Sequence, residues 1–194
     1  MTAAILARSA RAGGRLRQSE LALRSGIAGS SLSLIEHGKR EPTVATLETL
    51  LRATGHSLVT IPTVRSDAAR IAAGIRIALV DERGGGEASA FRRFLQLADN
   101  LQAEHGATRV GLTLTEPAPT GSGGWDAAIA ALCEYRLGAE SLPIPDWVGT
   151  RTGTPDAPWA PRTSDYDIPV DVTQVPNEFR TRGILIEAAT VESV

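Results

Sequence analysis

Four short amphipathic segments, each ended by glycine, fill the first 55 residues and constrain how this part of the chain can fold. Apolar residues recur three and four positions apart in each segment, a spacing that places them on one face of a helix. A glycine ends a helix readily because it adopts the left-handed conformation without strain. The pattern predicts four short helices around one small core, and the segments span residues 3–12, 17–26, 29–37 and 43–55.

The third segment opens the stretch GSSLSLIEHGKREPT, residues 29–43, which combines an apolar face with serines and cations. Leu32 and Ile35 lie three positions apart and are predicted to hold the helix on the core. The serines lie on the other side, where small side chains let a helix backbone come close to another molecule. Helix, three-residue turn and helix is the ground plan of a DNA-binding helix-turn-helix, whose second helix enters a major groove about 12 Å wide. The stretch therefore predicts a helix that reads DNA.

Nine residues are predicted to contact DNA, because they open the second helix, line the third or follow its end. The amide of Gln18 can contact a phosphate or brace the reading helix. The two cations after the third helix can reach backbone phosphates, and the helix N-termini present free N–H groups to anions. The nine are Arg17, Gln18, Gly29, Ser30, Ser31, Ser33, His37, Lys39 and Arg40.

Charge is divided unevenly along the chain, although the net charge is only −2. Residues 1–66 carry nine Lys or Arg against four Glu, which leaves +5, and residues 67–194 carry eleven Arg against eighteen Asp or Glu, which leaves −7. A basic surface is the electrostatic requirement for binding nucleic acid. The division favours double-stranded DNA as the partner of the first part.

Residues 16–58 resemble the Xre/Cro-type repressor domain over some forty positions. The resemblance implies a lambda-repressor-like domain of four or five helices that binds operator DNA as a homodimer on paired half-sites, and a chain that is not an enzyme. The matching positions are Gln18, Leu21-Ala22, Gly26-Ile27, Ser33, Glu36, Gly38, Pro42 and Thr46-Leu47.

The chain departs from that family pattern on the face that reads bases. Ala28 and Gly29 stand where the family usually has Ser or Thr followed by Gln, and Leu34 stands where Arg is frequent. Long bidentate side chains give the strongest base discrimination. We expect specificity aided by DNA shape or supplied by the spacing of a dimer. The alternative is that the domain has become a protein-interaction module.

The sequence divides into three predicted parts of a mainly α protein: residues 1–63, 64–105 and 106–194. The first is the DNA-binding domain. The second contains two helical stripes and is expected to form a hairpin that could dimerise. The third is expected to be a Pro-rich α+β region, with a linker at 116–124, coil from 141 to 170 and a short strand, ILIEA, at 184–188.

The last part loosely resembles the partner-binding regions of Xre-type antitoxins from bacterial toxin–antitoxin operons. Two stretches carry the resemblance, PTGSGGWDAAIAALCEYRLGAESLPIPDWV and PNEFRTRGILIEAATVESV. It implies a repressor that controls its own promoter and neutralises a cognate toxin through residues 106–194. The alternative is a stand-alone Xre-family repressor whose C-terminal region senses a ligand or a protein.

Other functions find little support in the sequence. The three histidines and the single cysteine, Cys133, lack metal-ligand spacing, so no metal or cofactor is predicted. The stretch SDYD, residues 164–167, resembles part of a nucleotidyltransferase metal site but lies in Pro-rich sequence far from a Gly-Ser pair. No apolar run is long enough to cross a membrane, and we expect a cytoplasmic protein.

Overall fold

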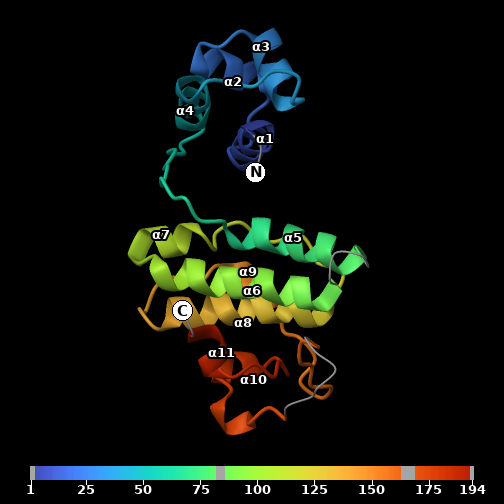
Figure 1. The fold of residues 1–194 in the computed structure, drawn as a ribbon. Helices are drawn as coiled ribbons and strands as arrows, with labels where there is room; N and C mark the ends of the chain where they lie inside the picture. Colours follow the sequence, from blue (N-terminus) through green and yellow to red (C-terminus); the bar gives the residue numbers. More distant parts are fainter. Residues whose placement is uncertain (1–2, 82–85, 163–168, 193–194) are drawn as a thin grey trace. The chain divides into compact units, whose positions relative to one another are not determined.

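The computed structural model describes residues 3–81, 86–162 and 169–192 (Figure 1). The described chain is mainly helical, as predicted, and divides into two compact units. Unit 1 comprises Met1–Thr60 and unit 2 comprises Ile61–Val194. Each unit has its own buried apolar core, so each is treated below by itself.

Unit 1 contains the four predicted helices: α1 (Ala3–Gly13), α2 (Gln18–Ser25), α3 (Gly29–Glu36) and α4 (Val44–Ala53). Three of the turns that follow them contain a glycine with positive φ: 69° at residue 26, 70° at residue 38 and 82° at residue 55. These left-handed residues reverse the chain within a few positions. The N-terminus of α4 is capped by Thr43, whose hydroxyl accepts a hydrogen bond from the backbone N–H of Thr46 at 3.2 Å.

The core of unit 1 is aliphatic and gathers one face of every helix. Leu32 and Ile35, the two residues predicted to hold α3, are 0% and 2% exposed. Because these two side chains anchor α3 from behind, its opposite face is left on the surface of the unit. The buried set is Ala7, Ala10, Leu21, Leu32, Ile35, Leu47, Leu50 and Leu51.

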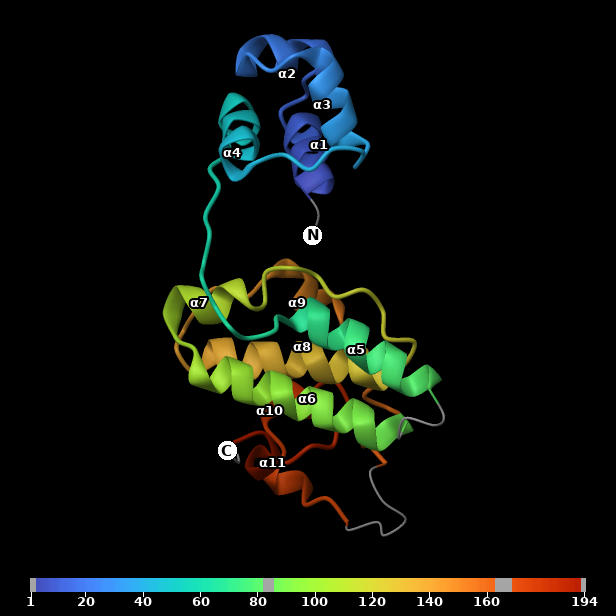
Figure 2. The same cartoon turned by 45° about the horizontal axis from the view of Figure 1, so that its top comes forward.

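Unit 2 is organised around three helices that run side by side, α5 (Ala68–Val80), α6 (Gly86–Ala103) and α8 (Gly123–Gly138) (Figure 2). Helices α5 and α6 form a hairpin and correspond to the two helical segments predicted within residues 64–105. Trp125 of α8 is fully buried and packs on Phe94 of α6, with ring centroids 5.6 Å apart. A single core therefore includes residues on both sides of position 105, where the sequence analysis placed a boundary.

The stretch 116–124, predicted as a linker, packs within unit 2. Pro117 and Thr120 are buried. The backbone N–H of Thr120 donates to the carboxylate of Asp126 at 2.9 Å, and its hydroxyl donates to the carbonyl of Ser122 at 3.1 Å. These bonds fold the stretch onto the N-terminus of α8, so its Pro, Gly and Ser content indicated irregular structure but not separation of domains.

The remaining elements of unit 2 are short and lie on both sides of the three long helices. They are α7 (Gly106–Gly111), α9 (Asp146–Thr150), the 3₁₀ helix η1 (Val172–Gln174), α10 (Asn177–Arg180) and α11 (Ala188–Glu192). Among the described residues no helix is long and apolar enough to cross a membrane.

The predicted α+β character of the C-terminal region is wrong for the part of the chain that the structure describes, which contains no strand. The segment ILIEA forms one isolated parallel bridge, between Ile184 and Trp159. Its two hydrogen bonds, both of 2.8 Å, join Trp159 to Gly183 and Leu185. Pro158 and Pro161 flank the bridge. Backbone groups alternate between the two edges of an extended segment, so the next donors on the bridge edge would come from residues 157 and 161. Pro161 has no N–H, and the N–H of Ala157 donates to the carbonyl of Thr154, so the pairing does not extend into a ladder.

Candidate DNA interface

Glu36, the last residue of α3, lies at the centre of the contacts that hold this helix in place. Its side chain is only 3% exposed, and both of its oxygens accept hydrogen bonds from the guanidinium of Arg11 on α1, at 2.7 and 3.0 Å. The amide of Gln18, the first residue of α2, donates to the same carboxylate at 3.0 Å. The carboxylate raises the pKa of Arg11 through these hydrogen bonds. We call Arg11, Gln18 and Glu36 the bracket.

The outward face of α3 carries four side chains at helical spacing: Ser30, Ser33, Leu34 and His37. Ser30 and His37 are exposed, Ser33 is half-buried and Leu34 is 43% exposed. Two of the four side chains are serines, and none of the four is Arg, Lys, Asn or Gln. A helix with such a face can come close to a groove floor, as a reading helix must.

The N-terminus of α3 adds backbone donors to that face. Ala28 occupies the cap position and provides no side-chain cap, and Gly29 beside it is exposed. Free N–H groups at the start of a helix attract anions, because they carry the positive end of the helix dipole. A phosphate is the anion that this geometry suits in a nucleic-acid complex.

The loop after α3 is tied back to the helix. The backbone N–H groups of Lys39 and Arg40 both donate to the carbonyl of Leu34, at 2.8 and 3.2 Å. The guanidinium of Arg40 donates to the hydroxyl of Ser31 at 3.1 Å. The structure thus brings Ser31 and Arg40 together and presents the exposed Lys39 beside them.

His37 closes the last turn of α3. Its Nδ1 lies 2.7 Å from the carbonyl oxygen of Ser33. A carbonyl can only accept, so this contact requires the proton on Nδ1 and leaves Nε2 free to face outward. At the start of α2, the backbone N–H of Arg17 donates to the carboxylate of Glu20 at 2.6 Å, and the Arg17 side chain is exposed.

The sequence analysis did not identify Arg11, and it included Glu36 only as a position of the family pattern. Their ion pair spans 25 residues, so spacing along one helix could not reveal it. The sequence did contain one signal for Glu36: it is a carboxylate in the last turn of a helix whose preceding residues include apolar ones. Gln18, for which a phosphate contact or a bracing role was predicted, braces α3 in this structure.

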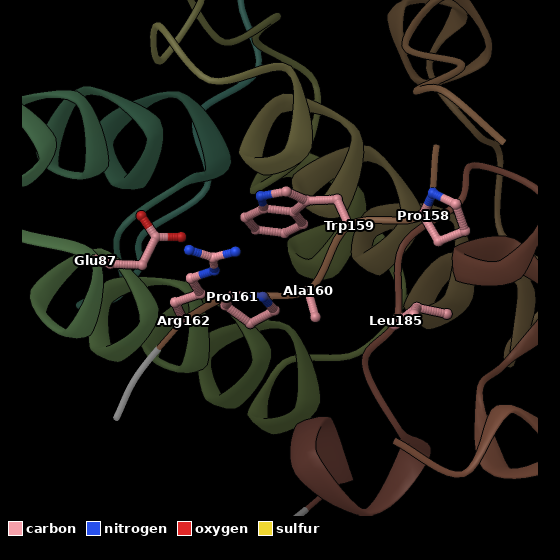
Figure 3. Close-up of a pocket in the computed structure, with 7 residues that line it drawn as sticks. All are labelled: Glu87, Pro158, Trp159, Ala160, Pro161, Arg162 and Leu185. Atoms are coloured by element: carbon pink, nitrogen blue, oxygen red, sulfur yellow. The ribbon is translucent and has the colours of Figure 1, made fainter. Parts of the chain in front are cut away.

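Unit 2 contains a pocket of about 580 Å³ beside Trp159 (Figure 3). The indole, Pro158, Pro161 and Leu185 provide apolar walls. The carboxylate of Glu87 and the guanidinium of Arg162 point toward the same space in the close-up. The SDYD stretch that was weighed as a metal site, residues 164–167, lies outside the described residues.

Residues 8–61 match the family model described as "Helix-turn-helix", which is of the Xre/Cro type. No curated protein and no solved structure matches the chain. The matched residues include most of α1 and all of α2, α3 and α4, together with the bracket and the outward face of α3. Residues 8–61 are therefore an Xre/Cro-type helix-turn-helix domain, the DNA-binding part of a transcriptional regulator.

Proposed function

We propose that the chain is a sequence-specific repressor that inserts α3 into the major groove of operator DNA. The observation that supports this most directly is the outward face of α3, which presents the short side chains of Ser30 and Ser33 and is anchored from behind by the bracket. The contact residues are those predicted from the sequence, from Arg17 at the start of α2 to Arg40 after α3. The surplus of positive charge on residues 1–66 supports the same assignment.

A charge placed on the reading face tests this proposal. Duplexes are first enriched with the full-length protein from a pool containing about 20 randomised base pairs, and affinity is then measured by fluorescence anisotropy. Ser30→Glu should weaken binding roughly tenfold or more, because like charges brought together at an interface cost several kcal/mol. The control is Ser57→Glu, an exposed serine after α4. Equal affinities of the two variants would contradict the assignment of α3 as the reading helix.

The repressor is proposed to act as a homodimer, since two half-sites about 34 Å apart match a two-fold protein. The hairpin of α5 and α6 is the proposed contact. Ile77 and Val80 on α5 are 63% and 78% exposed, an unusual position for such side chains in a helix that otherwise fills a core. Ile77→Asp should shift the protein toward monomer in sedimentation velocity. A dimer of unchanged stability would exclude this helix as the contact.

For unit 2 we propose the role of an antitoxin domain that binds a cognate toxin. The net charge of −7 on residues 67–194 supports binding of a basic partner. The test is co-expression with the product of the adjacent reading frame: the full chain should relieve its toxicity and copurify with it. A truncated control should end at Thr60, because a cut at 105 would divide the core shared by α6 and α8.

The alternative is a stand-alone repressor in which unit 2 senses a ligand. The pocket beside Trp159 supports this candidate, because its volume falls within the range of small-molecule sites. The two roles predict different results. The DNA affinity of an antitoxin should change when its toxin is added. The DNA affinity of a sensor should change when a small molecule is added, and the same molecule should alter tryptophan fluorescence.

A further inference from the structure

We infer that Leu34 reads the C5-methyl group of thymine, so that each half-site contains a thymine facing the middle of α3. The inference rests on the proposed function, because it requires α3 to lie in the major groove. It names the residue that gives specificity on a face whose other side chains are two serines and a histidine.

The position of Leu34 is unlike that of the other large apolar residues of α3. Leu32 and Ile35 are 0% and 2% exposed and fill the core, whereas Leu34 is 43% exposed. In the described part of unit 1, Leu34 is not among the side chains that pack on this core. Its side chain is therefore not required to hold α3 in place.

Leu34 lies on the same stripe as Ser30, Ser33 and His37, since these four are spaced by three or four residues. The serines beside it are short, so the leucine projects beyond them toward anything that approaches the face. Its carbonyl also accepts from both Lys39 and Arg40, which fixes this turn of the helix relative to the cations.

The chemistry of the major groove then limits what Leu34 can recognise. Guanine, adenine and cytosine present hydrogen-bond donors and acceptors there, and only thymine adds a methyl group. An aliphatic side chain buries that methyl favourably but would leave the polar edges of the other bases without partners. Leu34 therefore selects T·A over C·G at one position, without hydrogen bonding to the base.

Removing the methyl group alone provides a test. The full-length protein is titrated by anisotropy with its best enriched duplex, and with copies in which one thymine at a time is replaced by deoxyuridine. At one thymine position in each half-site, the single replacement should weaken binding about fourfold, because one methyl-sized group is no longer buried. Replacements elsewhere should have little effect.

Two variants assign the effect to its residue. Leu34→Ala should bind the thymine and deoxyuridine duplexes equally well, because the group that senses the methyl is gone. Leu23→Ala, which truncates a leucine that is 86% exposed on α2, should keep the fourfold difference. Because both side chains are exposed, both variants should fold, and circular dichroism checks this.

The outcomes distinguish this inference from the function on which it rests. If the wild-type protein binds its duplex but tolerates every deoxyuridine, or if Leu34→Ala keeps the difference, Leu34 does not read thymine. Unchanged DNA affinity of Leu34→Ala would likewise contradict the inference. If no duplex is enriched or bound at all, the proposed function itself is wrong and the inference is wrong with it.

Discussion

Arg11 and Glu36 join the first helix of unit 1 to the last residue of α3 through two hydrogen bonds, of 2.7 and 3.0 Å. The Glu36 side chain is almost completely buried, whereas the Arg11 side chain is 23% exposed. The pair therefore fixes the end of α3 from inside the domain. It fixes the orientation of α3 within unit 1, and neither Arg11 nor Glu36 is among the nine predicted DNA contacts.

The first prediction concerns the stability of unit 1. Glu36→Gln should lower its free energy of unfolding by about 2 kcal/mol, because hydrogen bonds to a buried charged group are lost. The matched control is Glu48→Gln on α4, whose exposed ion pair with Arg52 should contribute less than about 1 kcal/mol.

Every Phe, Tyr and Trp of the chain lies at residue 91 or later. Tryptophan fluorescence therefore follows unit 2, and circular dichroism follows both units. Glu36→Gln should shift only the dichroism transition, and a matching shift in fluorescence would contradict a role confined to unit 1.

The second prediction concerns phosphate contacts. Replacing Lys39 and Arg40 together by Ala should weaken binding to all duplexes alike and reduce the slope of log affinity against log salt by up to about two. Arg180, exposed on α10 and outside the proposed dimer contact, provides the control, whose replacement should leave the slope unchanged. If the slope of the Lys39/Arg40 variant equals that of the wild type, these cations do not contact phosphate.

The third prediction concerns the packing of Trp159 in unit 2. A Cβ atom added at Gly124 would lie 2.3 Å from the indole of Trp159, whereas one added at Gly123 would meet nothing within 4 Å. Gly124→Ala should therefore destabilise unit 2 by roughly 1–3 kcal/mol, since the indole must move away. Gly123→Ala should be neutral or slightly stabilising, because alanine favours helix. Urea unfolding followed by tryptophan fluorescence measures both, and equal midpoints would contradict the close contact.

The fourth prediction concerns acid stability. The pKa of Glu140 lies below its ordinary value of 4.5, because its carboxylate accepts hydrogen bonds from the His105 side chain and from the Gly106 N–H. A lowered folded-state pKa gives stability that is present above the ordinary value and is lost as the pH falls through the folded value. Glu140→Gln should therefore lower the fluorescence-detected unfolding midpoint at pH 6. The difference from wild type should shrink as the pH falls below 4.5.

The control for this pH series is Glu116→Gln: the Glu116 side chain is 60% exposed, and its carboxylate contacts Arg151 at 3.3 Å. Its midpoint should stay close to that of the wild type at both pH values. A difference between Glu140→Gln and wild type that persists unchanged to pH 3 would mean that the carboxylate acts through packing and not through its charge.

The helices of unit 1 could be predicted because their signals are local. Each helix has an apolar face at regular spacing, and three turns contain a glycine that the structure places at positive φ. The outward position of the serines followed directly from the burial of Leu32 and Ile35. The bracket could not be predicted in the same way, since Arg11 and Glu36 meet only after α1 and α3 have packed.

Unit 2 was harder to predict because its order depends on contacts between distant segments. Trp125 packs against both Phe94 and Trp159, and neither partner lies near it in sequence. Pro117 and Thr120 belong to a stretch whose composition is typical of a linker, yet both are buried. Composition reports how irregular a segment is, whereas burial depends on whether the rest of the fold leaves a place for it.

The proline residues on either side of the Trp159–Ile184 bridge also bear on how the protein behaves at high concentration. An extended segment with a row of free backbone donors is a template on which another chain can assemble. Pro158 removes a donor from one edge of the segment and Pro161 removes a donor from the other, so the segment is a poor seed for intermolecular sheet growth. The unit that contains all the aromatic side chains is thereby protected against amyloid-like association at this segment.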